Sequence, residues 1–137
     1  MSQGKMTFTV SAQRESAEQS KSSGLRGSVI MDTGYGGVTA GLNPVELLLS
    51  AVAACMIKGI ERVAPMINFA FTGASVELEA VRQDSPPKVE SIRYVLTVAT
   101  DETDERLALL HQNLMKFGTI YNTVAADTDL AGEIRRA

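Results

Sequence analysis

A long apolar stretch is the most distinctive pattern along the chain. Residues 47–57 are hydrophobic with a single exception. Just upstream, Asn43 is a good N-cap, and Pro44 suits the first helical position, where a missing N–H costs nothing. We therefore predict a helix over residues 44–64 that Pro65 ends. Because its first half has no polar stripe, this helix should be buried on most sides and form the centre of the fold.

Alternating apolar and polar residues predict strands on both sides of that helix. In the first of them, Met6, Phe8 and Val10 share one face, which should be half-buried. A break at Ser85-Pro86-Pro87 separates two strongly alternating segments, which we expect to pair antiparallel. The expected strands are residues 5–14, 25–31, 72–82, 91–99 and 130–135.

A second helix should begin at Thr103 or Asp104 and end near Gly118. Residues 119–127 can form a further short helix. Residues 15–24 have the composition of a loop or hairpin tip, and residues 32–37 that of a turn. The apolar face of the second helix would be Leu107, Leu110, Leu114 and Phe117. Strands, a buried helix, more strands and a second helix follow one another in that order. This grouping indicates an α+β fold and not an alternating parallel sheet.

Composition narrows the classes of protein that fit. The 137 residues suit one domain, residues 1–137, with 45% hydrophobic and 21% charged residues. A net charge of -3 offers no general attraction to nucleic acid or to an anionic membrane. The N-terminus does not resemble a signal peptide, and the apolar stretch is too short to span a bilayer. We therefore expect a soluble protein of the cytoplasm.

Cys55 is the only cysteine, so no disulfide can form within the chain, and the single histidine excludes a zinc cluster of His and Cys. No metal or cofactor is expected. A free cysteine often behaves as a small buried hydrophobe. A functional role would need a thiolate, stabilised by a nearby positive charge or hydrogen-bond donor. Lys58, three positions on, lies on a similar helix face but can equally be a solvated charge.

Other residues have both a functional and a structural interpretation. Glu46 favours the positive end of the helix dipole, and on a straight helix it points away from Cys55, so it would serve a thiol only through another subunit. His111 can form a Cys–His dyad in space or be a half-buried structural histidine. Arg14 and Arg26, near strand ends, can bind an anion, hold a thiolate or lie on the surface.

Residues 41–55 resemble the OsmC/Ohr superfamily. The similarity lies in the Asn-Pro start, the acidic residue, the apolar helix and the small residues before the cysteine: Gly-Leu-Asn-Pro-Val-Glu-Leu-Leu-Leu-Ser-Ala-Val-Ala-Ala-Cys. The order of elements fits along nearly the whole chain, and the motif is closer to the general OsmC-like branch than to the organic hydroperoxide resistance branch. The resemblance implies an intertwined homodimer, with antiparallel curved sheets around long central helices and two active sites at the interface.

In peroxidase members of that superfamily, a cysteine of the central helix attacks the hydroperoxide, and the sulfenic acid condenses with a second cysteine. An arginine of the N-terminal strand and a glutamate near the helix start activate the first thiol. This resemblance implies that Cys55 is the nucleophile. It also implies that Arg14 is the activating arginine, with Arg26 as the second choice. Two features depart from it: Gly118 stands where the second cysteine is expected, and Glu46 comes one residue late.

Two functions follow from these observations. The first is a one-cysteine peroxidase that acts on small organic hydroperoxides with Cys55, and that needs an external thiol as reductant because the chain has no second cysteine. The second is a non-catalytic protein of the same fold, which binds a small apolar or thiol-reactive ligand or senses redox state. In both, the expected protein partner is a second copy of the chain.

Overall fold

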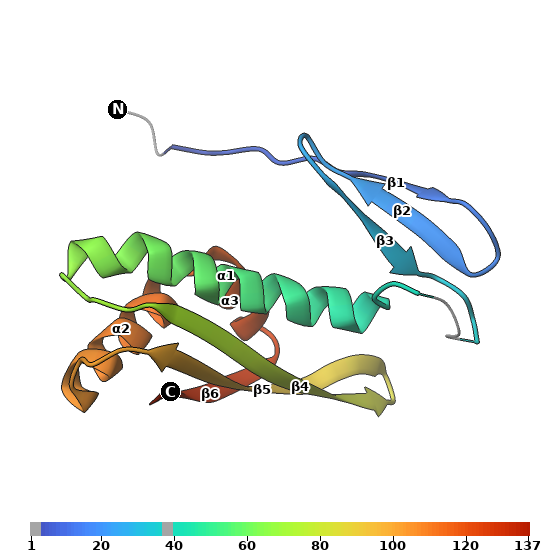
Figure 1. Ribbon diagram of the computed structural model, residues 1–137. Helices are drawn as coiled ribbons and strands as arrows, with labels where there is room; N and C mark the ends of the chain where they lie inside the picture. The colour runs from blue at the N-terminus through green and yellow to red at the C-terminus, as the bar shows by residue number, and fades with distance from the viewer. Residues whose placement is uncertain (1–3, 37–39) are drawn as a thin grey trace. The chain divides into compact units, whose positions relative to one another are not determined.

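The computed structural model describes residues 4–36 and 40–137. They form two compact units, one ending at Leu47 and the other comprising Leu48–Ala137, and each is considered by itself. The strands and helices confirm the α+β class (Figure 1). In chain order they are β1 (Ser11–Arg14), β2 (Gln19–Ser23), β3 (Ser28–Asp32), α1 (Pro44–Met66), β4 (Gly73–Asp84), β5 (Pro87–Ala99), α2 (Asp104–Phe117), α3 (Thr119–Ala125) and β6 (Asp129–Arg136).

The first unit contains an antiparallel sheet in the order β1-β2-β3. Residues 15–24 were expected to be a loop or hairpin tip. Residues 15–18 do connect β1 to β2, but the rest include β2, which a polar sequence without alternating apolar residues does not reveal. Ser20 of β2 is buried, and its hydroxyl lies 2.7 Å from that of Thr33. Of the turn expected at residues 32–37, Gly37 lies outside the described residues.

Gly41 joins this sheet to the start of α1. Its φ of 110° lies in a region that side chains rarely adopt, and a Cβ there would lie 2.9 Å from the carbonyl oxygen of Ile30. The backbone N–H of Asp32 donates to the carbonyl of Leu42, at 2.9 Å. Glycine at this position therefore allows the chain to pass close to β3 before the helix begins.

The strand expected over residues 5–14 is correct only for its last part, Ser11–Arg14. Met6, Phe8 and Val10 are 76%, 80% and 69% exposed, where a half-buried face was expected. The physical reason is that a strand buries a face only against neighbours, and residues 4–10 pair with no strand among the described residues.

The second unit contains a three-stranded sheet in the order β4-β5-β6. As expected, β4 and β5 pair antiparallel, from Gly73 opposite Ala99 to Asp84 opposite Pro87. The expectation of antiparallel sheets is wrong for β6, which pairs parallel to β5. The reason is the connection: α2 and α3 bring the chain back along the sheet, as a helical crossover does between parallel strands.

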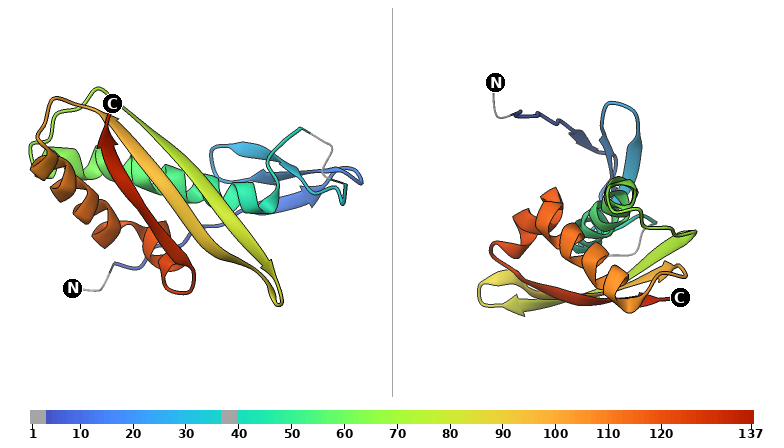
Figure 2. Two further views of the ribbon diagram at one scale, coloured as in Figure 1. Left: turned by 90° about the horizontal axis from the view of Figure 1, so that it is seen from below. Right: turned by 90° about the vertical axis from the view of Figure 1, so that its left-hand side faces the viewer.

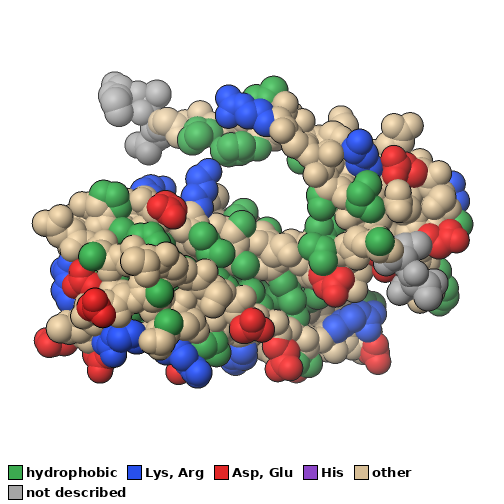
Figure 3. All heavy atoms as spheres, viewed as in Figure 1, with side chains coloured by type: hydrophobic (Ala, Val, Ile, Leu, Met, Phe, Trp, Pro, Cys, Tyr) green, Lys and Arg blue, Asp and Glu red, His purple; other side chains and the backbone are tan. Residues whose placement is uncertain are grey.

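Three helices cover one face of this sheet, as Figures 1 and 2 both show. The core forms between them, from alternate residues of β5 and the apolar faces of the helices. Its fully buried side chains are Val52, Met56, Ile60, Val63, Ile92, Leu96, Val98 and Leu110. On the opposite face of the sheet Glu77, Glu79 and Arg93 are exposed, and charged side chains gather along that side in Figure 3.

Helix α1 begins as expected, with reciprocal bonds between Asn43 and Glu46. The Glu46 N–H donates to Oδ1 of Asn43 at 2.8 Å, and the Asn43 N–H donates to Oε1 of Glu46 at 2.9 Å, which forms a capping box. Pro65 was expected to end the helix, but it lies in the last turn, and α1 ends one residue later at Met66. At this position proline's missing N–H removes only one of the last helical bonds.

The expectation that α1 is buried on most sides is wrong for the described chain. Leu48 is 36% and Ile57 39% exposed. The buried residues lie along one stripe, because the sheet and the other helices of the second unit cover only one side of the helix. They are Val52, Met56, Gly59, Ile60, Val63 and Ala64.

Helix α2 begins at the expected cap, where the Thr103 side chain accepts a bond of 3.2 Å from the N–H of Arg106. Leu107, Leu110 and Leu114 are buried as expected. Phe117 was expected on the same face but is 45% exposed, because it lies at the edge of the stripe where the helix ends. None of the helices in the described residues is long and apolar enough to cross a membrane.

Candidate functional site

Cys55 lies on α1, partly buried, and packs against the hydrophobic core of the second unit. Met56, the next residue, is 2% exposed and points into that core. Within residues 48–137, no side chain donates a hydrogen bond to the Cys55 sulfur. The thiol is therefore on the rim of the core and is held there by packing.

The backbone of Gly118 lies directly against this sulfur. A Cβ placed on Gly118 would be 3.1 Å from Sγ of Cys55, 2.8 Å from the carbonyl oxygen of Leu114 and 3.0 Å from Cβ of Tyr121. Gly118 is buried between α2 and α3 and ends the first of these helices. The residue that replaces the expected second cysteine is thus beside Cys55 in space, 63 positions later in the sequence.

The first prediction follows from this distance. Across a disulfide, the Cβ of one cysteine lies about 3 Å from the sulfur of the other, close to the 3.1 Å found here. We expect Gly118→Cys to form a disulfide with Cys55 on mild oxidation. A thiol assay would count two free thiols before oxidation and none after it.

The matched control for this disulfide is Thr119→Cys, because Thr119 is exposed and adjacent to Gly118. It should keep both thiols under the same conditions. In Gly118→Cys, crowding of the new side chain by Leu114 and Tyr121 is expected to lower the stability by about 1–3 kcal/mol. A folded Gly118→Cys protein whose two thiols stay free would contradict the geometry.

Arg62, which no motif in the sequence singled out, connects the Cys55 helix to this junction. Its guanidinium donates a hydrogen bond of 2.8 Å to the carbonyl of Phe117, the residue before Gly118. Arg62 follows Cys55 by seven residues, which is two helical turns and places both on one face of α1. That spacing is the only signal in the sequence that points to it.

His111 takes part in a different cluster. Its Nε2 lies 2.6 Å from the hydroxyl of Tyr94, and the ring of Tyr94 is in edge contact with that of Tyr121 at 6.3 Å between centroids. Burial raises the pKa of Tyr94, and a hydrogen bond with Tyr121 raises it further. Burial lowers the pKa of His111. This geometry supports the structural reading of His111, whose ring bonds a tyrosine and not the thiol.

The second prediction concerns how stability depends on pH at His111. The imidazole pKa is below its ordinary value of 6.5 in the folded protein. The unfolded chain therefore binds a proton at this histidine more readily than the folded protein does. The contribution of the neutral imidazole to the stability of the folded state is complete above pH 6.5 and is lost as pH falls below it. We expect the free energy of unfolding, measured with urea, to fall more steeply below pH 6.5 in the native chain than in His111→Gln.

A comparison with Tyr94→Phe separates the hydrogen bond from burial in this experiment. This variant removes the phenol that bonds His111 but leaves the imidazole in place. Because burial is what lowers the imidazole pKa, the steeper fall in stability below pH 6.5 should be retained. If the free energy of unfolding fell with pH in the same way for the native chain and for His111→Gln, the prediction would be wrong, because His111 would then titrate alike in the folded and unfolded states.

The other expected site residues are divided between the two units. Arg14 ends β1 opposite Ser20, and Arg26 lies in the turn between β2 and β3; both are exposed residues of the first unit. Glu46 also belongs to the first unit, where its carboxylate caps α1. Lys58 is exposed on α1. The second unit thus brings Cys55 together with Gly118 and Tyr121 but with none of the expected activating residues.

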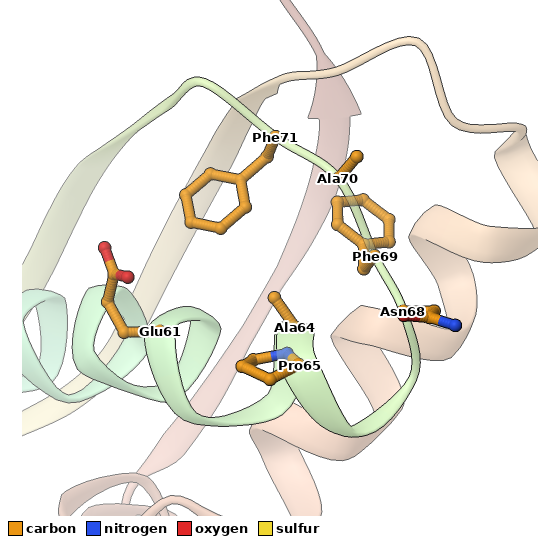
Figure 4. Close-up of a pocket in the computed structure, with 7 residues that line it drawn as sticks. All are labelled: Glu61, Ala64, Pro65, Asn68, Phe69, Ala70 and Phe71. Carbon is orange, nitrogen blue, oxygen red and sulfur yellow. The ribbon is translucent and has the colours of Figure 1, made fainter.

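A surface pocket of about 390 Å³ lies at the end of α1 (Figure 4). Its lining residues are Glu61, Ala64, Pro65, Asn68, Phe69, Ala70 and Phe71. The Glu61 carboxylate and the Phe71 ring face the same space in Figure 4. The lining does not include Cys55, so this pocket is not the site of thiol chemistry.

Comparisons with known proteins agree with this fold. An OsmC-like structure from Mycoplasma pneumoniae superimposes with a TM-score of 0.85 at 14% identity, over 96% of this chain and 96% of that one. An organic hydroperoxide resistance protein, OhrB of Bacillus subtilis, gives 0.69 at 19% identity over 94% and 98%. A protein from Legionella pneumophila, described as an organic hydroperoxide resistance protein and predicted redox protein, gives 0.72 at 18% over 96% and 99%.

Sequence comparison adds the family. No curated protein matches the chain in sequence. The family model described as OsmC-like protein matches residues 34–131, which include α1 with Cys55 and the junction at Gly118. This match covers most of the chain and agrees with the solved structures in fold. The chain belongs to the OsmC-like protein family.

Proposed function

We propose that this protein is a one-cysteine, thiol-dependent peroxidase that reduces small organic hydroperoxides. The observation that carries the proposal is the contact between Cys55 and Gly118. The family resemblance leads us to expect a second cysteine at this position, where the chain has glycine. Structural relatives described as organic hydroperoxide resistance proteins support the substrate class. Cys55 is the only sulfur of the chain that can become a thiolate.

The reaction consumes two external thiols for each hydroperoxide. The Cys55 thiolate attacks the distal oxygen of ROOH, and an S–O bond forms while the O–O bond breaks. Cys55 becomes a sulfenic acid, and the alkoxide takes a proton and leaves as ROH. A first thiol displaces water from the sulfenic acid to form a mixed disulfide. A second attacks that disulfide and restores the Cys55 thiolate, releasing the oxidised thiol pair. A plentiful thiol reductant is typical of a reducing compartment, and we propose a cytoplasmic location.

Activation of the thiol is proposed to come from the N-terminal part of a protomer. Arg14 is the first candidate for stabilising the thiolate and Arg26 the second, because a guanidinium lowers the pKa of a nearby thiol. Glu46 is proposed to orient that arginine in addition to capping α1. No donor to Cys55 lies within residues 48–137, so a cation from outside this unit is needed for activity.

A trapping experiment tests the peroxidase proposal. The purified protein is treated with one equivalent of cumene hydroperoxide and then with dimedone, which reacts with sulfenic acids but not with thiols. We expect a dimedone adduct on Cys55 in the mass spectrum, and its loss when dithiothreitol is added before dimedone. A thiol that stays unmodified by the hydroperoxide would overturn the proposal.

A homodimer is proposed as the functional state. The alternating apolar side chains of Met6, Phe8 and Val10 are exposed to solvent in the single chain, which supports a partner that covers them. The third prediction is that light scattering will give about twice the chain mass of 14.7 kDa. Phe8→Asp should shift the protein towards the monomer, while Lys5→Asp, next to this stripe, should not. A native monomer would contradict this assembly.

The alternative is a protein that binds or senses a small ligand without turnover. It is favoured by one observation, the absence of a hydrogen-bond donor to Cys55 within residues 48–137. In that case Cys55 serves mainly in packing against the core. A Cys55 thiol that titrates near the ~8.5 of a free cysteine and does not react with hydroperoxide would favour this function.

A further inference from the structure

The junction between α2 and α3 presents three successive carbonyl groups near Cys55, and each accepts a hydrogen bond. Asn122 side chain Nδ2 donates to the carbonyl of Lys116 at 3.1 Å, and the Asn122 backbone N–H donates to that of Gly118 at 2.9 Å. Both of these donors belong to α3. The carbonyl between them, that of Phe117, accepts from Arg62 of α1 at 2.8 Å.

The Arg62 bond therefore differs from its neighbours. Among the hydrogen bonds of the described residues, it alone ties α1 to the junction of residues 116–118. The carbonyl that it binds is one of the last in α2, where no helical N–H is left to satisfy it and the helix dipole is negative. A guanidinium suits this position, because a charged donor makes a stronger bond than a neutral one.

We propose that Arg62 is a positioning residue that holds the backbone of Gly118 against the Cys55 sulfur. Gly118 follows Phe117 directly in the chain. A hydrogen bond that fixes the Phe117 carbonyl therefore also fixes the Gly118 backbone beside the thiol. Its consequence for chemistry rests on the proposed peroxidase function. The sulfenic oxygen and the incoming reductant have to fit beside Sγ in the space that this close contact with the Gly118 backbone leaves.

The positioning is measured directly in the Gly118→Cys background. The equilibrium between its internal disulfide and glutathione gives an effective concentration of one thiol for the other, which depends on how well the two positions are held together. We expect Arg62→Gln to lower this effective concentration about tenfold, the effect of losing one charge-assisted hydrogen bond. Arg62→Lys, which keeps a charged donor, should retain most of it.

Arg82→Gln is the matched control. Arg82 is an exposed arginine of β4, paired with Asp84 at 2.7 Å, and its loss removes a surface charge and an ion pair without touching the junction. It should leave the effective concentration unchanged. Equal values for Arg62→Gln and Arg82→Gln would overturn the proposal, because Arg62 would then be an ordinary surface residue.

A second measurement needs no new cysteine. In the native sequence, Arg62→Gln should increase the rate of alkylation of Cys55 by iodoacetamide several-fold, since the junction covers the sulfur less closely. An unchanged rate would count against the positioning role even if the Gly118→Cys variant failed to fold. Neither measurement requires peroxide turnover, so an inactive protein would disprove the peroxidase function and leave the role of Arg62 testable.

Discussion

Cys55→Ser is expected to lower the rate of cumene hydroperoxide consumption, with dithiothreitol as reductant, at least about 100-fold, to the level of the buffer. A serine hydroxyl has nearly the size of a thiol, but it is not ionised near neutral pH and is a poor nucleophile towards the O–O bond. The chain has no other cysteine that could take over the reaction. The measurement is the initial rate of hydroperoxide loss at saturating reductant.

The control for this variant is Ala53→Ser, which places the same hydroxyl on the same helix two positions earlier, at a partly buried residue. It should retain most of the activity, and both variants should have the circular dichroism of the native chain. If Cys55→Ser kept more than a small part of the native rate, a different group would have to carry out the chemistry. The peroxidase proposal would then fail.

Gly132→Ala should destabilise the protein by about 3 kcal/mol or more, a large share of the total for a domain of this size. Gly132 lies in β6 opposite Tyr94 of β5. A Cβ there would overlap the Tyr94 carbonyl oxygen and lie 2.5 Å from Cγ of its ring. These atoms cannot move aside without shifting β5, because the Tyr94 side chain is 2% exposed and bonded to His111.

Gly73→Ala serves as the matched control for this change. Gly73 begins β4, and a Cβ there would lie 3.8 Å from that of Ala99, an ordinary contact. We expect urea unfolding of Gly73→Ala to give a free energy close to that of the native chain, or slightly higher because the unfolded state loses freedom. Equal stabilities for the two alanine variants would show that β5 and β6 are not packed as closely as described.

Local patterns were sufficient to predict β5 and the starts of α1 and α2. Alternation along residues 91–99 predicted the buried side of β5, where Ile92 is fully buried and Tyr94 nearly so. The Asn43-Pro44 start and the Thr103 cap fixed where α1 and α2 begin. These signals are reliable because caps and alternation depend on residues a few positions apart, whose geometry is set by the element itself.

Other features depend on contacts that the sequence pattern does not record. The same alternation is present at Met6 and Phe8, but their side chains are exposed. Whether a strand face is buried depends on a neighbouring element, which can lie far along the chain or outside it. The parallel pairing of β6 depends on the path taken by α2 and α3. The predicted roles of Arg14 and Glu46 at the thiol stay predictions.

The sequence by itself determined the α+β class, the long helix that carries Cys55, and the lack of a second cysteine, because each depends on composition or on spacing within one element. Only the tertiary structure decided that Gly118 lies against Sγ and that Arg62 bonds the carbonyl beside it. Such contacts join residues more than 50 positions apart, and they exist only after packing has brought separate helices together, which no local periodicity encodes.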